Sequence, residues 1–236
     1  MSNLSDSGDG AQEAHWIPLS DLMTGLMVMF LFIAVVYMMR VEADTDNIKE
    51  VAIAYSEVKD SLYEDLSTEF HDDLSKWKAE IVKDDLSIRF TEPEILFANG
   101  SSELKPSFQA ILDNFFPRYV KILTSDKYRD SISEVRIEGH TSLMWENTGS
   151  SAEAYFYNMD LSQARTRSTL FYVLKLPAVA KDSVWLRKYV TANGLSSSHP
   201  VLGADGSEDA ARSRRVEFRV RTDAETRIAK ILQISK

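Results

Sequence analysis

An uncharged apolar run near the N-terminus constrains this chain more than any other feature. Residues 22–39 read LMTGLMVMFLFIAVVYMM and contain no charged side chain. Extended back to Trp16, the run reaches the length of roughly 20 residues that an α-helix needs to cross a bilayer. Trp16 and Tyr37 have the amphipathic rings typical of membrane interfaces. The sequence therefore predicts one transmembrane helix over residues 16–40, after a leader over residues 1–15.

A cleavable signal peptide is the alternative for this segment. Such peptides carry a positively charged start and a small-residue cleavage site. The leader has no Lys or Arg, and the run continues into Met38-Met39-Arg40 without a small-x-small site. A retained membrane helix therefore fits better. Because no basic residue precedes the span and Arg40 follows it, the positive-inside rule gives no support to a cytoplasmic N-terminus.

The composition of the whole chain excludes several classes of protein. The 236 residues carry a formal net charge of -9, which does not suit a nucleic-acid-binding protein. The absence of cysteine excludes disulfides, thiol nucleophiles and Cys-type zinc sites. The 4 His residues show no HExxH spacing, and there is no P-loop or GxSxG motif. We therefore expect no enzyme, no metal site and no cofactor.

Asp21 stands near the start of the predicted membrane helix, beside Ser20 and Thr24. A medium of low dielectric constant favours the neutral form of a carboxyl group, and ionisable residues inside membranes mark proton and ion pathways. Asp21 is equally placed to cap the helix N-terminus with Ser20, because the helix dipole favours a carboxylate there. Position alone leaves both roles open.

The run Ser20-Asp21-Leu22-Met23-Thr24 is followed by a helix rich in Met and Phe. This pattern resembles the transmembrane signature of the MotB family of stator subunits and its relatives. The resemblance implies that Asp21 carries the ion, with Ser20 and Thr24 beside it. We expect protons rather than sodium, because the span offers few other oxygen ligands for a metal cation. The resemblance also implies a multi-span, MotA-like channel partner and a homodimer.

Residues 41–85 contain no Pro or Gly and carry a helical hydrophobic stripe. Apolar residues recur every three or four positions from Ile48 to Ile81, a pattern typical of an amphipathic helix that packs on a partner or on itself. One interpretation is a helical stalk between the membrane helix and the next domain. The other is one or two helices folded onto that domain. We favour the stalk over residues 41–85.

Strand and helix patterns alternate from residue 86, which predicts an α+β domain with helices on one face of a sheet. Strands are expected at residues 86–90, 135–137, 189–194 and 214–221. Helices are expected at residues 106–123, 161–174 and 225–234. Pro117 should kink or interrupt the first of these helices, because proline removes a backbone hydrogen bond.

Four motifs follow one another in this domain. They are ILFANGSSEL at 95–104, IEGHT at 137–141, YNMDLSQAR at 157–165 and ARSRRVE at 211–217. In type and order these motifs are similar to those of OmpA-like domains. The resemblance implies an OmpA-like α/β sandwich over residues 86–236 that binds the peptidoglycan stem peptide, chiefly its carboxylate-bearing diamino acid.

The same resemblance implies a set of wall-binding residues, namely Tyr157, Asn158, Leu161, Arg165, Thr141 and Arg214. A guanidinium such as that of Arg165 forms two parallel hydrogen bonds to a carboxylate. Asn158 offers a donor and an acceptor, and Tyr157 offers an aromatic wall with a polar tip. Core packing stays open as a role for Tyr157 and Leu161, as does a structural salt bridge for Arg165.

The chain departs from the OmpA-like pattern at the wall-binding site. Ser142 stands where that family has an Asp that would contact the amino group of the ligand, and Ser213 replaces the usual Asn. Residues 143–156 lengthen the loop before Tyr157. Glu146 or Glu153 in this loop could replace the missing carboxylate, or both could be solvated loop charges.

Together, the two halves predict an inner-membrane protein with a cytoplasmic N-terminus and a periplasmic peptidoglycan-binding domain. Such a protein would serve as the wall-anchored stator subunit of an ion-driven motor. Ser142, the short acidic leader and the set around Arg165 resemble the stator-like subunits of the Zorya family of anti-phage defence systems. A flagellar stator subunit and a passive peptidoglycan tether are the alternatives.

Overall fold

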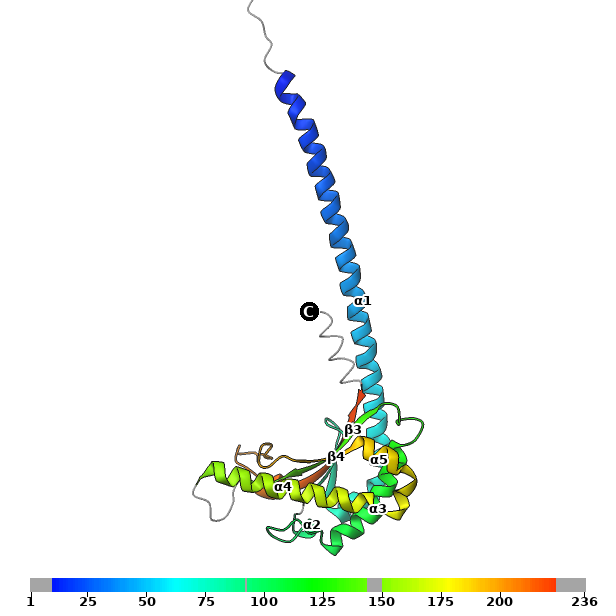
Figure 1. Ribbon diagram of the computed structural model, residues 1–236, viewed down its shortest axis with the longest axis vertical. Helices are drawn as coiled ribbons and strands as arrows, with labels where there is room; N and C mark the ends of the chain where they lie inside the picture. The colour runs from blue at the N-terminus through cyan, green and yellow to red at the C-terminus, as the bar shows by residue number, and fades with distance from the viewer. Residues whose placement is uncertain (1–9, 92, 144–149, 224–236) are drawn as a thin grey trace, which may run out of the picture. The chain divides into compact units, whose positions relative to one another are not determined.

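Figure 1 shows the computed structural model, which describes residues 10–91, 93–143 and 150–223. The part of α1 up to Glu50 belongs to one compact unit, and residues from Val51 onwards form a second. The helices are α1 (Gly10–Trp77), α2 (Pro93–Leu96), α3 (Pro106–Leu123), α4 (Ser151–Leu174), the 3-10 helix η1 (Pro177–Asp182), α5 (Ser183–Tyr189) and α6 (Ala210–Ser213). The strands are β1 (Ala79–Val82), β2 (Ser87–Phe90), β3 (Ile132–His140), β4 (Val190–Gly194) and β5 (Arg215–Thr222).

The first unit contains a stretch of α1 that is apolar on all sides. Ser20–Thr45 is long and apolar enough to cross a membrane, with a mean hydropathy of 2.4, and none of it is buried within the protein. Its large hydrophobic side chains between Leu22 and Met39 are 45–70% exposed. Exposing apolar surface to water costs about 25 cal/mol per Å², so this stretch requires lipid or partner helices around it. The structure thus contains the predicted apolar N-terminal helix.

The last turns of α1 belong to the second unit and are part of its core. Leu62, Leu66 and Phe70 are fully buried, and the Phe70 ring lies 5.2 Å from that of Phe115 in α3. The chain then enters β1 at Ala79. The alternative of a helix folded onto the domain therefore describes this segment, and the predicted boundary at residue 85 lies too far along the chain. An apolar stripe has the same sequence pattern whether the helix packs on a partner helix or on a sheet. The sequence alone therefore could not distinguish a stalk from a helix folded onto the domain.

The second unit is built on a five-stranded sheet with the order β1-β2-β5-β3-β4. β3 and β4 are parallel, and the other neighbouring strands are antiparallel. One face of the sheet is apolar, and its side chains pack with α1 and α3. Phe218 of β5 lies at its centre, with its ring 5.0 Å from that of Phe115. This arrangement confirms the predicted α+β class with helices covering a sheet (Figure 1).

Several observed elements differ from the predicted ones, and three of the differences concern the core and the site. α3 has the predicted bounds but runs through Pro117 without interruption, held on both sides by buried residues such as Phe115 and Tyr119. α4 begins at Ser151, ten residues before the predicted start, and the Ser150 hydroxyl caps it by accepting from the backbone N–H of Glu153. The third difference is β1, which was not predicted. The helix expected at residues 225–234 lies outside the described residues.

Candidate functional site

Two glycines allow α4 to lie directly against the ends of β3 and β4. A Cβ atom on Gly139 would come within 2.7 Å of Thr166 Cγ2 and 2.9 Å of the Ser162 carbonyl oxygen. A Cβ atom on Gly194 would overlap the backbone of Gln163. Side chains larger than glycine would therefore push the helix away. This close approach places the buried face of α4 beside the C-terminal end of β3.

Arg165 projects from this face of α4 into the domain. Its residue exposure is only 9%. Its Nε donates to the Ser101 carbonyl oxygen at 2.8 Å and its Nη2 to that of Ala98 at 3.4 Å, while the guanidinium carbon lies 4.9 Å from the centre of the Phe97 ring. Within the described residues no carboxylate lies within salt-bridge distance of Arg165. The alternative of a structural salt bridge is therefore not realised there.

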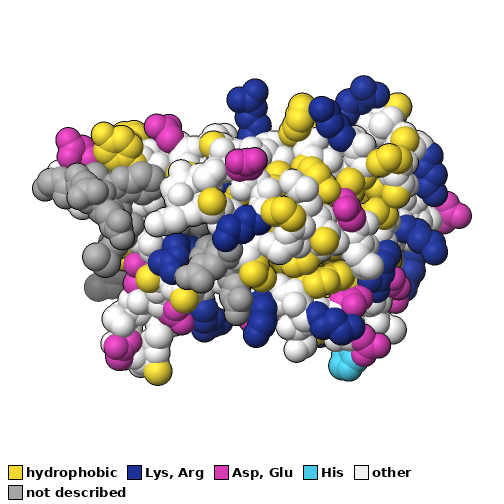
Figure 2. Space-filling view, turned by 90° about the horizontal axis from the view of Figure 1, so that it is seen from below, with side chains coloured by type: hydrophobic (Ala, Val, Ile, Leu, Met, Phe, Trp, Pro, Cys, Tyr) yellow, Lys and Arg dark blue, Asp and Glu magenta, His cyan; other side chains and the backbone are white. Residues whose placement is uncertain are grey.

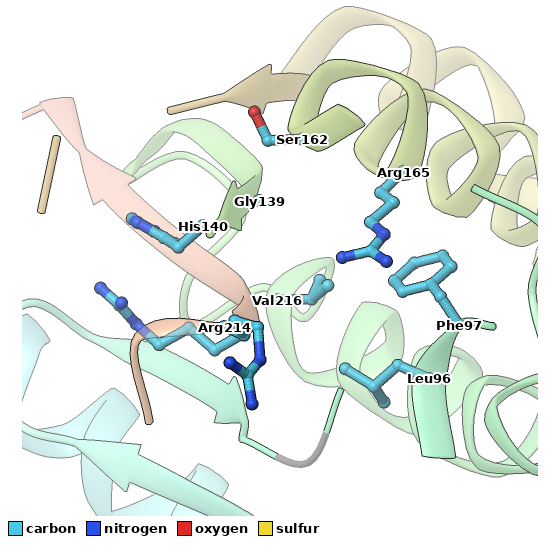
Figure 3. A pocket seen from close by; sticks show the side chains of 9 residues that line it. Leu96, Phe97, Gly139, His140, Ser162, Arg165, Arg214 and Val216 are labelled. Atoms are coloured by element: carbon cyan, nitrogen blue, oxygen red, sulfur yellow. The ribbon is translucent and has the colours of Figure 1, made fainter. Parts of the chain in front are cut away.

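A small pocket lies at the end of β3, with a cavity volume of about 10 Å³. Figure 3 shows the Arg165 guanidinium pointing into it between Phe97 and Val216, with Arg214 on the opposite wall. Burial, together with repulsion from Arg214, lowers the pKa of Arg165 to about 10. The group still carries its charge near neutral pH. Two guanidinium groups without a described carboxylate partner make this pocket suited to an anion.

The other predicted wall-binding residues do not line the pocket. Asn158 is buried, and its Nδ2 donates to the Ser142 carbonyl oxygen at 3.1 Å. Thr141 is buried as well, and its hydroxyl has no hydrogen-bond partner among the described residues. Tyr157 is 52% exposed and Leu161 is half-buried. Core packing thus does not describe Tyr157.

The surface around the domain carries charges of both signs. Figure 2 shows one face on which Lys and Arg side chains alternate with Asp, Glu and hydrophobic ones. No broad positive field covers this face, in keeping with the net charge of -9. An anion would therefore be recognised by the two arginines of the pocket rather than by the surface as a whole.

A buried charge network on the polar face of the sheet was not predicted. Glu138 of β3 and Glu217 of β5 lie directly opposite each other across the two strands, and both are 2% exposed. Arg215 Nε lies 2.5 Å and Arg89 Nε 3.0 Å from Glu217 Oε1. The sequences of β3 and β5 carry charged residues at alternate positions. This pattern could have indicated the network, because alternate residues of a strand lie on the same face of the sheet.

His140 completes this network. Its Nε2 atom lies 3.8 Å from a carboxylate oxygen of Glu138 and from one of Glu217. Burial, aided by Arg215, lowers the pKa of His140. Burial would raise the pKa of Glu138, but His140 and nearby arginines outweigh it and lower that pKa.

A glutamate pair with a histidine is a ligand set that transition metals accept. Here Arg215 and Arg89 already supply positive charge to Glu217. A divalent cation would be repelled by these guanidinium groups. The geometry therefore favours an ionic network that joins β2, β3 and β5.

The residues predicted to carry an ion lie in the apolar stretch of α1. The Thr24 hydroxyl donates to the Ser20 carbonyl oxygen at 2.8 Å. Thr24 lies one helical turn after both Ser20 and Asp21, at spacings of four and three residues that place it next to each of them. Asp21 is exposed like its neighbours, so a partner subunit can reach it. The side chain of Trp16 lies outside the described residues.

Comparisons with known proteins relate the chain to one curated protein and to several solved domains. No family model matches. The chain is 50% identical over 219 residues to the Zorya protein ZorB of Escherichia coli, covering 93% of this chain and 92% of that protein. Among solved structures it is similar to a MotB-like protein from Desulfovibrio vulgaris, with 24% identity over 70% of this chain and 91% of the other, and a TM-score of 0.48. It is also similar to the cell wall anchor of the T6SS from Pseudomonas aeruginosa, with 25% identity over 66% and 96% and a TM-score of 0.44.

Proposed function

The chain belongs to the family of the Zorya protein ZorB, and from this we propose that it is the wall-anchored stator subunit of an ion-driven complex in anti-phage defence. The proposal joins the two units of the molecule. The apolar stretch of α1 anchors the chain in the inner membrane, and the folded domain holds peptidoglycan outside it. The N-terminus then lies in the cytoplasm and the domain in the periplasm.

The pocket formed by Arg165 and Arg214 carries the wall-binding half of the proposal. Its two guanidinium groups line the pocket, and guanidinium groups bind carboxylates, which the stem peptide of peptidoglycan presents. Phe97 and two backbone carbonyl groups hold Arg165 in place, so little side-chain entropy is lost when a ligand binds. Tyr157, Asn158, Leu161 and Thr141 border the same end of the domain.

Asp21 carries the ion-translocating half of the proposal. A carboxyl group that alternates between the neutral and the charged form can pass a proton across a low-dielectric region. One helix cannot enclose such a path, so a multi-span channel subunit must surround it, and a second copy of this chain would complete the complex. Ser20 and Thr24 lie on the same side of the helix and can orient the proton or a water molecule next to Asp21.

Binding of the full-length chain to purified peptidoglycan sacculi tests the wall anchor. In detergent micelles, Arg165→Ala should reduce the fraction that sediments with sacculi by tenfold or more, since a charge-assisted hydrogen bond contributes about 1.5–3 kcal/mol. Arg167→Ala is the matched control, because Arg167 lies two residues further along α4 and is exposed. Equal sedimentation of the wild type and Arg165→Ala would contradict the proposed anchor.

A further inference from the structure

The segment formed by η1 and α5 carries three exposed basic side chains around one exposed apolar side chain. Val184, Arg187 and Lys188 lie three and four residues apart on α5 and so share one side of this helix. Lys181, in the last turn of η1, precedes Val184 by three residues. Val184 is 74% exposed, the largest exposed fraction among the described large hydrophobic residues, and the three basic residues are exposed as well. We call these four residues the basic edge.

The charges of the basic edge have no ionic partner among the described residues. Arg187 Nε donates to a carbonyl oxygen of its own helix at 3.2 Å, and Lys188 Nζ lies 4.7 Å from the centre of the Tyr189 ring. Asp182 is the only acidic residue within residues 163–190. The neighbouring loop between α3 and β3 adds no net charge, because it carries Asp126, Lys127, Arg129 and Asp130. In a chain with a net charge of -9, the basic edge is therefore locally positive.

The basic edge and the pocket lie at opposite ends of the sheet. β3 and β4 are parallel, with Val135 opposite Val190 and Gly139 opposite Gly194. α5 leads directly into β4 at Val190, so the basic edge lies at the start of both strands, whereas the pocket lies at their C-terminal end. Figure 1 shows α5 and the C-terminal end of α4 on one side of the domain and the N-terminal end of α4 on the other.

α1 enters the domain at the same end as the basic edge. Lys59 Nζ donates at 2.7 Å to the Asp84 carbonyl oxygen in the turn between β1 and β2. Tyr128, in the loop that leads into β3, donates at 2.6 Å to the carboxylate of Asp65. Residues 46–61 separate the apolar stretch from the first buried core residue of α1, and a helix of that length spans roughly 25 Å. The connection to the membrane is thus attached at the end that carries the basic edge.

We propose that the basic edge docks the domain on the anionic phospholipid surface of the membrane that α1 spans. Lys and Arg side chains are attracted to an anionic leaflet, and an apolar side chain among them enters the headgroup region. One side of a seven-residue helix is far smaller than the area of about 800 Å² that a partner contributes to a stable protein interface, whereas a lipid surface needs no matching shape. The inference rests on the membrane anchor of the proposed function and not on wall binding.

Fluorescence of the full-length chain in nanodiscs tests this docking, because the sequence contains no cysteine that would compete for a label. A fluorophore on Ala180→Cys lies next to the basic edge, and spin-labelled lipid quenches it on contact. We expect quenching in discs of equal parts phosphatidylglycerol and phosphatidylcholine, and little in discs of phosphatidylcholine alone. Ala152→Cys, which is also exposed but lies in the first turn of α4, is the matched control and should show no quenching in either disc.

Charge reversal identifies the groups that dock. Lys181→Glu combined with Lys188→Glu should lower the ratio of docked to free domain by about 25-fold or more, since each basic residue near an anionic surface contributes about fivefold. Salt at about 1 M should release the domain in the same way. Lys76→Glu, at the other end of the domain-embedded part of α1, should leave the quenching unchanged. Sedimentation of the charge-reversed chain with sacculi should also be unchanged, because the pocket lies at the opposite end.

The remaining outcomes would overturn the proposal. Equal quenching in neutral and anionic discs, or quenching that survives the charge reversal, would show that the basic edge does not bind anionic lipid. A blue-shifted fluorescence without quenching would mean that protein covers this surface instead. A chain that does not enter nanodiscs would overturn the membrane anchor and this inference with it, whereas a loss of sacculus binding alone would leave the docking intact.

Discussion

Two stretches of α1 carry hydrophobic residues but place them in different surroundings. Between Leu22 and Met39 the large apolar side chains are exposed on every side of the helix. Between Leu62 and Trp77 the apolar residues form one stripe, and that stripe is buried against α3 and the sheet. Apolar residues all around a helix require lipid or a ring of partner helices, whereas a stripe needs only one neighbouring face.

The two stretches therefore depend on different sources of stability, the core of the domain and the surroundings of the apolar helix. The domain is held by its own core, so its folding is expected to be independent of the membrane. The apolar stretch has no protein core and depends on its surroundings. Substitutions between Leu62 and Trp77 should therefore lower the stability of the domain. Substitutions between Leu22 and Met39 should leave it unchanged.

Truncation of one phenylalanine in each stretch gives the largest expected difference. Phe70→Ala should destabilise the domain by about 3–5 kcal/mol, because it leaves a cavity next to Phe115. Phe32→Ala should leave the unfolding of the domain unchanged. Denaturant unfolding of the full-length chain in detergent micelles, followed by tryptophan fluorescence, measures both. Similar unfolding midpoints for Phe70→Ala and the wild type would mean that the end of α1 is not part of the core.

Glycine substitutions compare the same two regions of the molecule, with a smaller expected change in domain stability. Gly139→Ala should cost about 1–3 kcal/mol, because the added methyl group meets the Ser162 backbone and α4 must shift. Gly25→Ala in the apolar stretch has nothing within 4 Å of the added atom, so it should leave domain stability as it is. Thermal unfolding compares the two. A neutral Gly139→Ala would show that α4 does not lie so close to the sheet.

The pH dependence of stability gives the smallest expected effect and probes the polar face of the sheet. The folded pKa of His140 is lowered, so the unfolded state binds more protons, and stability should fall as the pH falls from about 6.5 towards the folded pKa. The lowered pKa of Glu138 adds a further loss below about 4.5. Neither effect should depend on the apolar stretch of α1.

Unfolding midpoints between pH 7.5 and 5 measure this slope. His140→Gln should flatten it above pH 5, because glutamine does not titrate. Substitution of the exposed His71 is the matched control and should leave the slope unchanged. A slope that survives in His140→Gln would assign the pH dependence to another group.

The sequence predicted the class of the domain and the position of Arg165 on a helix, because local patterns of residues determine both. The apolar run, the bounds of α3 and the position of Arg165 on a helix all follow from periodicity and motif. The burial of Leu62 and Phe70 could not be predicted, because a helical stripe does not say which surface it meets. The network of Glu138, Glu217 and His140 was not predicted, because it forms between two strands that lie far apart along the chain.

Phage protection by cells that carry this chain together with its channel partner tests the ion-driven role of Asp21 most directly, comparing the wild type with Asp21→Asn at equal membrane levels. Asp44→Asn, at the other end of the apolar stretch, is the control. Asp21→Asn should abolish protection while Asp44→Asn retains it, because Asp21 is the residue proposed to carry the ion. Full protection by Asp21→Asn would contradict an ion-driven stator and reduce Asp21 to a helix cap on a wall-tethered scaffold.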